Sequence, residues 1–322
     1  MDPILDADAV IQGECPALWE ALSPLGRRAR QPANFLPLQT LEARGKAFNA
    51  TIGQITDGQG RAVPLSPMLA ALVGLDEEER SRSFLYSPVD GLPELRRAWR
   101  AWQRRGQRPD LPSSLPTVTV GPAHARCLAA ELFVAEGRSV VLPQPCRDGD
   151  RDLFVLRLGA RPLPCAEPLS VSRILDGLPE GEPAVVLLES SPAFLDGLLA
   201  AAERRPLVVI VDDTWERLGT PSASLFWGLA GRHPNLIPIK VDGADGHFGF
   251  PGGRVGFLTF PFEPESPIAA ALESKVKMLL RAQVGSPSAA TQVVLLRALR
   301  ERGPTAATPP TAPARPSQRR DT

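Results

Sequence analysis

Short apolar runs that alternate with helical stretches constrain the fold of this chain more than any other sequence feature. Two of them, Ala184–Leu188 and Leu207–Val211, are continuously apolar, as expected for strands buried on both faces. The predicted strands are Thr117–Val120, Ser139–Leu142, Ala184–Leu188, Leu207–Val211, Leu236–Lys240 and Val255–Phe260. Because helical segments separate these runs, the sequence predicts an α/β domain with a mostly parallel sheet. Ligands of such sheets bind at the carboxyl ends of the strands.

The predicted helix that begins near Pro93 has a clear apolar face. Leu95, Ala98, Trp99 and Trp102 recur at helical spacing. We interpret the two tryptophans as core anchors rather than a ligand stack. The predicted polar face of this helix carries Arg96, Arg97 and Arg100. Further helices are predicted at Ala17–Leu22, Ala123–Ala135, Ile268–Gln283 and Ala289–Arg300, and an extended segment at Arg30–Pro37.

Composition excludes several classes of protein. The 36 basic and 36 acidic side chains balance, which argues against a nucleic-acid-binding protein. The acidic segment Met1–Ala9 lacks the basic start of a signal peptide, and no apolar run approaches the roughly 18 residues that span a bilayer. We therefore expect a cytoplasmic protein without membrane contact. Its scattered cysteines, expected to be reduced thiols, are Cys15, Cys127, Cys146 and Cys165.

Four local features carry potential chemistry, and their order along the chain is informative. They are the turn and helix start Tyr86–Arg96, the strand, glycine and helix start Thr117–Ala123, the buried strand with an acidic end Val208–Trp215, and the glycine-rich turn Phe248–Phe257. A helix N-terminus after a glycine suits a phosphate, and an arginine in a glycine-rich turn suits an anion. An aspartate at a strand end is more often a cap than a ligand, so each feature alone is weak.

Together, in this order, the four features resemble the large domain of class I/II aminotransferases. These are fold-type I enzymes that use pyridoxal phosphate. The resemblance extends from about Phe48 to Leu299. It implies a fold-type I large domain with a truncated small domain, and a homodimer that acts on small amino and keto acids.

The resemblance also implies a phosphate end and a ring end of a cofactor site. Gly121, Pro122 and Ala123 match the turn that cradles the phosphate, and Arg254 matches the arginine that clamps it. Asp212 matches the aspartate that pairs with the pyridine nitrogen and keeps it protonated, so that the ring can accept electrons.

The resemblance implies roles for three further residues around the cofactor. Tyr86, the only tyrosine, matches a residue that reaches the phosphate across a dimer interface. Trp215 stands where the family has a tyrosine that hydrogen-bonds to the phenolic oxygen of the cofactor. The indole of tryptophan offers an N–H donor, but its ring has a different shape. Gly53 resembles a backbone turn on the substrate side.

The lysine that attaches the cofactor is missing from the pattern. In the family it lies eight residues before the phosphate-clamping arginine, and Gly246 stands there. Lys240, six residues upstream, is either a substitute or a solvated charge at a strand end. His247 is either a base or a surface-loop histidine.

Other positions also depart from the family pattern. Ala193 stands where an asparagine bonds the cofactor oxygen, and Arg147 stands where an aromatic ring stacks. An arginine can stack on a ring, but it also places a cation there. The family arginine that binds the substrate carboxylate has no folded counterpart, because Arg315, Arg319 and Arg320 lie in a proline-rich tail predicted to be disordered.

We expect four parts: an N-terminal arm or partial small domain (1–47), the large domain (48–265), interdomain helices (266–302) and the tail (303–322). The sequence predicts an aminotransferase-like protein that binds pyridoxal phosphate non-covalently and has impaired or lost transamination. Two alternatives stay open. One is an active enzyme that uses Lys240, and the other is a non-catalytic subunit that pairs with an intact homologue. No metal site is predicted.

Overall fold

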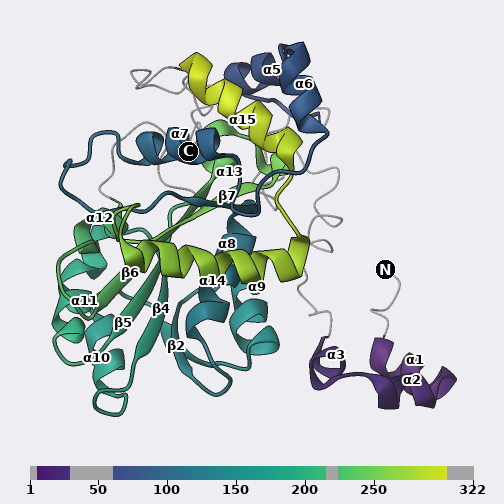
Figure 1. Cartoon of the computed structure of the whole chain (residues 1–322). Helices are drawn as coiled ribbons and strands as arrows, with labels where there is room; N and C mark the ends of the chain where they lie inside the picture. Colours follow the sequence, from purple (N-terminus) through teal and green to yellow (C-terminus); the bar gives the residue numbers. More distant parts are fainter. Residues whose placement is uncertain (1–5, 30–60, 215–223, 303–322) are drawn as a thin grey trace, which may run out of the picture.

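The computed structural model describes residues 6–29, 61–214 and 224–302. Gly53, Trp215, the extended segment Arg30–Pro37 and the three tail arginines lie outside the described residues, as does Lys46. A seven-stranded mixed sheet forms the centre of the described chain (Figure 1). Its strands are β1 (Thr117–Val120), β2 (Ser139–Pro143), β3 (Arg161–Cys165), β4 (Ala184–Glu189), β5 (Leu207–Asp212), β6 (Leu236–Gly243) and β7 (Val255–Thr259).

The strand order is β1-β7-β6-β5-β4-β2-β3, and the four pairings from β3 to β6 are parallel. Strand β7 runs antiparallel to both β6 and β1. The predicted α/β fold with a mostly parallel sheet is therefore confirmed. The sequence did not predict β3, whose run RPLPC contains two prolines. Proline cannot donate to a strand ladder, which is tolerated here because β3 lies at the edge of the sheet.

Helices cover both faces of this sheet. The described helices are α1 (Ala7–Glu14), α2 (Pro16–Ala21), α3 (Pro24–Arg28), α5 (Ser66–Val73), α6 (Glu77–Ser83), α7 (Pro93–Gln103), α8 (Gly121–Phe133), α9 (Asp148–Arg151), α10 (Ser170–Asp176), α11 (Leu195–Ala202), α12 (Leu225–Leu229), α13 (Ala244–Phe248), α14 (Pro267–Val284) and α15 (Ala289–Arg302), with a π-helix η1 (Asp152–Arg157) and the 3₁₀ turns η2 (Pro192–Phe194) and η3 (Pro251–Gly253).

Alternation along β5 divides its side chains between the two faces. Val208 and Ile210 pack in the cluster formed by α8, η1 and α14. Val209 and Val211 pack in the cluster formed by α10, α11 and α12. Since successive strand side chains point to opposite faces, Asp212 follows Ile210 onto the α8 face. The alternation of side chains therefore decides on which face of the sheet each polar residue at a strand end finds its partners.

A third apolar cluster joins α5, α7, α13 and α15 beside β1 and β7. Trp99 is fully buried there and stacks on Phe257 with ring centroids 4.1 Å apart, which is the core role predicted for it. The predicted polar face of α7 is wrong at Arg96. The Arg96 side chain is buried, and it forms ion pairs with both Asp90 and Glu273. These two carboxylates compensate its charge in the interior. Periodicity could not reveal two partners supplied by other segments.

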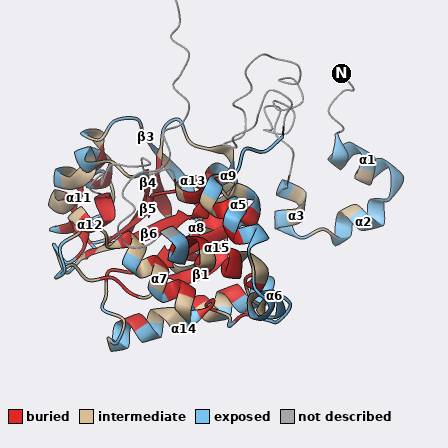
Figure 2. Ribbon diagram, turned by 90° about the horizontal axis from the view of Figure 1, so that it is seen from above, coloured by how far each residue is buried: buried red, intermediate tan, exposed pale blue. Residues whose placement is uncertain are grey.

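The N-terminal helices α1–α3 contribute no buried residue, whereas the sheet and the helices against it are largely buried (Figure 2). Among the described segments, no helix is long and apolar enough to cross a membrane. The four cysteines form no disulfide.

Candidate functional site

The carboxyl ends of the parallel strands meet at one edge of the sheet, where two acidic residues end adjacent strands. Glu189 ends β4 and Asp212 ends β5, and the two are register partners. The Asp212 side chain is almost fully buried, and its Oδ1 accepts a hydrogen bond of 2.9 Å from the backbone N–H of Thr214. This edge also receives the turn from β1 into α8. The predicted phosphate turn and the predicted ring-nitrogen carboxylate therefore lie at the same edge.

Two arginines hold the other oxygen of Asp212. Arg126, on the second turn of α8, donates from Nη1 to Oδ2 over 2.7 Å, and Arg147 donates from Nη2 to the same oxygen. Burial alone would raise the pKa of Asp212. The two guanidinium charges outweigh burial and hold that pKa below its usual value. Asp212 is therefore an ionised carboxylate whose counter-ions belong to its own chain.

Asp150 of α9 completes this charged cluster. Its Oδ2 accepts a hydrogen bond of 3.1 Å from Arg147 Nε. Its Oδ1 lies 2.7 Å from Arg126 Nε, as an ion pair without hydrogen-bond geometry. We call Asp212, Arg126, Asp150 and Arg147 the arginine–aspartate cluster. Two positive and two negative charges make it neutral, and Arg147 also lies 3.8 Å from Glu189.

The turn at Gly121 lies directly against Arg254. Gly121 has a φ of +78°, and a Cβ placed on it would come 2.3 Å from Arg254 Nη2. Only glycine permits both this conformation and this close approach. Arg254 itself has a φ of 48° and pairs through Nη1 with Asp245 Oδ2 at 3.2 Å. The arginine and the helix N-terminus are therefore placed together, as an anion site requires.

Two details weaken the phosphate cradle. Pro122 follows Gly121 and has no backbone N–H to offer an anion. Asp245 places a carboxylate beside Arg254, and its Oδ1 has no hydrogen-bond partner among the described residues. Burial raises the pKa of Asp245 more than the charge of Arg254 lowers it. The turn retains the shape of an anion site with fewer donors and a neighbouring acid.

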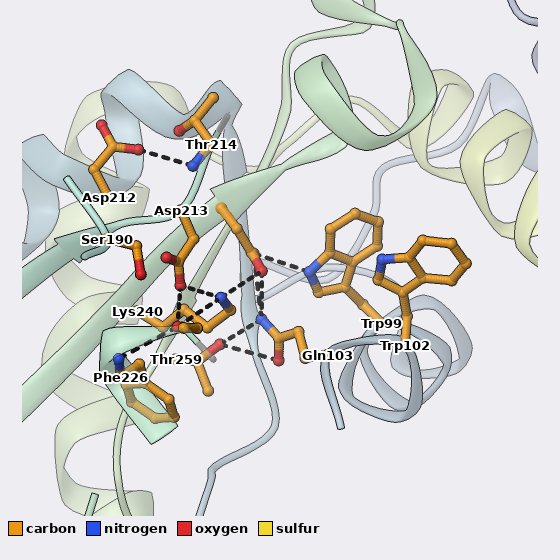
Figure 3. A network of polar contacts seen from close by, with 12 residues as sticks. Trp99, Trp102, Gln103, Ser190, Asp212, Asp213, Thr214, Phe226, Lys240 and Thr259 are labelled. Carbon is orange, nitrogen blue, oxygen red and sulfur yellow. Dashed lines mark hydrogen bonds and ion pairs between the residues drawn. The ribbon is translucent and has the colours of Figure 1, made fainter. Parts of the chain in front are cut away.

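Gly246 lies buried in the short helix α13, next to Asp245. The structure does not bring Lys240 to this side of the sheet. Ile239 and Val241 pack in the α8-side cluster, so the side chain between them points to the other face. There Lys240 forms an ion pair with Asp213, and its Nζ lies 3.5 Å from Ser224 Oγ and 3.7 Å from Asp242 Oδ2 (Figure 3).

The interpretation of Lys240 as a solvated strand-end charge is wrong. Its side chain is only 2% exposed, because β6 extends to Gly243 and carries it into the interior. Asp242 is held in turn by Trp99 Nε1 at 2.9 Å and by Gln103 Nε2 at 3.0 Å. Burial raises the pKa of Asp242 more than the charge of Lys240 lowers it. This network joins β5, β6 and α7 (Figure 3).

The remaining predicted residues lie apart from the cluster or form part of it. Tyr86 is 98% exposed between α6 and α7, and no described residue covers it. His247 lies on α13 with its ring edge toward Trp99 and Trp102, at 6.4 and 6.2 Å between centroids. Ala193 lies in η2, which follows β4. Arg147 is a member of the arginine–aspartate cluster.

Sequence reasoning missed Arg126, Asp150 and Asp245. The available signal for Arg126 was its position on an otherwise apolar helix face, between Ala125 and Leu128, which are both fully buried. A charge at such a position needs a buried counter-ion. Which acid supplies it depends on tertiary contacts. Among the described residues, no group of three or more His, Cys, Asp or Glu side chains could hold a metal ion.

Several aminotransferases of known structure share this sheet and these helices. An aromatic-amino-acid aminotransferase from Burkholderia pseudomallei, covalently bound to pyridoxal phosphate, matches with a TM-score of 0.67 and 18% identity. The match covers 89% of this chain and 77% of that one. This chain has the aminotransferase fold.

Two further aminotransferases give the same result. An aspartate aminotransferase double mutant from Thermus thermophilus matches with a TM-score of 0.64 and 18% identity, covering 88% of this chain and 74% of that one. An aminotransferase from Anaerococcus prevotii DSM 20548 matches with a TM-score of 0.67 and 15% identity, covering 83% and 71%. About a quarter of each of these aminotransferases therefore lies outside the match. No protein-family model matches the sequence, and no curated protein matches it.

Pyridoxal phosphate, the cofactor implied by the resemblance, fits the two ends of this aminotransferase-fold site unequally. Gly121 and Arg254 are placed to contact a phosphate, although Pro122 removes one donor. At the ring end, both oxygens of Asp212 already accept hydrogen bonds from the chain. The residues present do not fit the whole cofactor, and we derive no catalytic step through it.

Proposed function

We propose that this chain is a protein of the aminotransferase fold that does not carry out transamination. The observation that carries the proposal is the position of lysine. Gly246 stands where the family pattern requires the imine-forming lysine, and Lys240 lies on the opposite face of the sheet in an ion pair with Asp213. Glycine has no side chain that could form an imine or move a proton between carbon atoms.

The other described lysines give no substitute. Lys277 pairs with Asp90 at 3.1 Å and with Glu273 at 2.9 Å on α14, and Lys275 is exposed on the same helix. An ammonium group held between carboxylates keeps its proton and is a poor nucleophile. Pyridoxal phosphate that reaches the site is therefore expected to bind without a covalent bond. The sequence predicts that Asp212, Arg254 and the Gly121 turn would carry such binding. Of these, Arg254 and Gly121 are placed to contact a phosphate, whereas both oxygens of Asp212 already accept hydrogen bonds from the chain.

Trapping with borohydride tests the proposal. Purified protein is incubated with an equimolar amount of pyridoxal phosphate, reduced, digested and mapped by mass spectrometry. We expect no pyridoxyl adduct on Lys240, and no spectral change of the cofactor when amino or keto acids are added. Exposed Lys275 is the internal control, because a second sample with excess cofactor should carry an adduct there and show that trapping works. A stoichiometric adduct on Lys240, with half-transamination of an amino acid, would mean that the chain is an active enzyme.

We also propose that the chain associates with a second copy through the segment between α6 and α7. Phe84 and Tyr86 are more than nine-tenths exposed, and Leu85 between them is about two-thirds exposed. Three adjacent large apolar side chains in water favour association. The resemblance implies that Tyr86 lies at a dimer interface, which agrees with its exposure here.

Light scattering coupled to gel filtration measures this association. Wild-type protein should elute with about twice the chain mass of 34.6 kDa, and Leu85→Glu should shift it toward the monomer. Leu169→Glu is the matched control, because Leu169 is 90% exposed outside this segment. A monomeric wild type, or a Leu85→Glu variant that remains dimeric, would rule out this interface. Co-purification of a related chain instead of a second copy would favour a non-catalytic subunit.

A further inference from the structure

The arginine–aspartate cluster occupies the end of the site where the resemblance places a pyridine ring. Asp212 contributes a carboxylate whose side chain is 2% exposed, and each of its oxygens is in use. Arg126 reaches it from α8, with a side chain that is 11% exposed. Arg147 reaches it from the segment after β2. Asp150 contacts the Nε atoms of both arginines, Arg147 by a hydrogen bond and Arg126 by an ion pair. The cluster therefore spans three segments at the carboxyl edge of the sheet.

Charge makes this arrangement incompatible with a protonated ring nitrogen. A pyridinium N–H beside Asp212 Oδ2 would lie within hydrogen-bond reach of two guanidinium groups. Like charges at such separations repel strongly when they are buried, and the side chain of Arg126 is only 11% exposed, whereas that of Arg147 is 37% exposed. The ring would have to displace Arg126, and Asp150 would then be left in the interior with one counter-ion fewer. An uncompensated buried carboxylate is strongly unfavourable.

We propose that this chain excludes the pyridoxal ring from its own site: Arg126 and Arg147 stand at Asp212 in place of the ring nitrogen. The inference rests on the proposed loss of transamination. It adds that the chain has lost the binding site for the cofactor ring as well as the lysine that would attach the cofactor. Only the turn at Gly121 and the side chain of Arg254 then remain to attract a phosphorylated ligand. The ring of the cofactor should add little to the affinity of its phosphate.

Calorimetric titration with pyridoxamine phosphate and with inorganic phosphate measures the contribution of the ring. Pyridoxamine phosphate has no aldehyde, so surface lysines cannot capture it. We expect wild-type protein to bind the two ligands with dissociation constants within about threefold of each other, because a preference of tenfold needs about one charge-assisted hydrogen bond. A wild-type preference for pyridoxamine phosphate of tenfold or more would overturn the inference, even if no lysine adduct forms.

A variant that opens the ring end provides the converse test. Arg126→Leu, Arg147→Phe and Asp150→Asn together remove both guanidinium groups and the acid that pairs with them, and leave Asp212 Oδ2 free to accept a hydrogen bond. This variant should bind pyridoxamine phosphate about tenfold or more tightly than inorganic phosphate. Adding Asp212→Asn should abolish this preference for pyridoxamine phosphate over inorganic phosphate. A folded triple variant without this preference contradicts the inference.

Two simpler variants keep the test decisive if the triple variant is unstable. Arg147→Phe alone leaves Arg126 paired with both Asp150 and Asp212, so the fold should persist. It should gain preference for pyridoxamine phosphate by a smaller factor than the triple variant. Arg151→Leu is the matched control on α9, because that side chain is exposed and should change neither affinity. Equal gains in Arg147→Phe and Arg151→Leu would assign the effect to net charge and reject the specific role of the cluster.

Discussion

Lys240→Met should lower the free energy of unfolding by about 3–5 kcal/mol, the usual cost of removing one partner of a buried ion pair. Methionine matches the length of the lysine stem but leaves Asp213 and Asp242 without their cation. Both carboxylates are almost fully buried, and Ser224, Trp99 and Gln103 can donate hydrogen bonds to them but carry no charge. Denaturant unfolding followed by circular dichroism gives the change, with the slope checked for two-state behaviour.

Two companion variants show whether the loss comes from the ion pair. Lys275→Met removes an exposed lysine from α14 and should change stability by no more than about 0.5 kcal/mol. Adding Asp213→Asn to Lys240→Met removes the stranded charge and should restore part of the loss, since neutral partners are tolerated better than one unpaired charge. A Lys240→Met variant as stable as Lys275→Met would show that Lys240 has no structural role and would reopen its catalytic assignment.

Gly256→Ala should lower the free energy of unfolding by about 3 kcal/mol or more, or prevent folding. Gly256 lies in β7, opposite Thr119 of β1 and Gly243 of β6. A Cβ there would lie 2.3 Å from the carbonyl carbon of Gly121 and 2.5 Å from the nitrogen of Pro122. Because both contacts are with backbone, α8 or β7 would have to move as a whole. Thermal and denaturant unfolding measure the loss.

Gly252→Ala is the matched control for this prediction. Gly252 lies in η3, the turn that precedes β7, and a Cβ there would meet no atom within 4 Å. It should leave stability within about 0.5 kcal/mol of wild type. Equal losses in the two variants would show that chain stiffness, and not the contact with the Gly121 turn, limits substitution here. The comparison therefore tests directly how closely β7 supports the start of α8.

The strands and long helices could be predicted from the sequence because their signals are local. Apolar runs such as Leu207–Val211 and the helical spacing around Trp99 correspond to β5 and α7. The edge strand Arg161–Cys165 was missed because its prolines are atypical of strands. Arg96 was placed on the polar face of its helix, and its burial could not be foreseen because its two acidic partners come from other segments.

At the candidate site, the order of motifs indicated Gly121, Asp212 and Arg254, and the structure places all three at one edge of the sheet. The partners of Asp212 could not be predicted from the order of motifs. Arg126 and Arg147 precede it by 86 and 65 positions, and no pattern in the chain links residues that far apart. The burial of Lys240 depended likewise on the face to which β6 turns that side chain.

The sequence by itself determined the α/β fold and the absence of lysine at position 246. These properties follow from short-range periodicity and from residue identity at one place in an ordered set of motifs. Only the tertiary structure decided which charges meet. Pairing among Asp212, Arg126, Asp150 and Arg147 requires the sheet to bring separate segments to one edge, and side-chain alternation on β6 places Lys240 on the opposite face. Contacts of this kind are set by the packing of the whole chain, because burial compels each charge to find a partner.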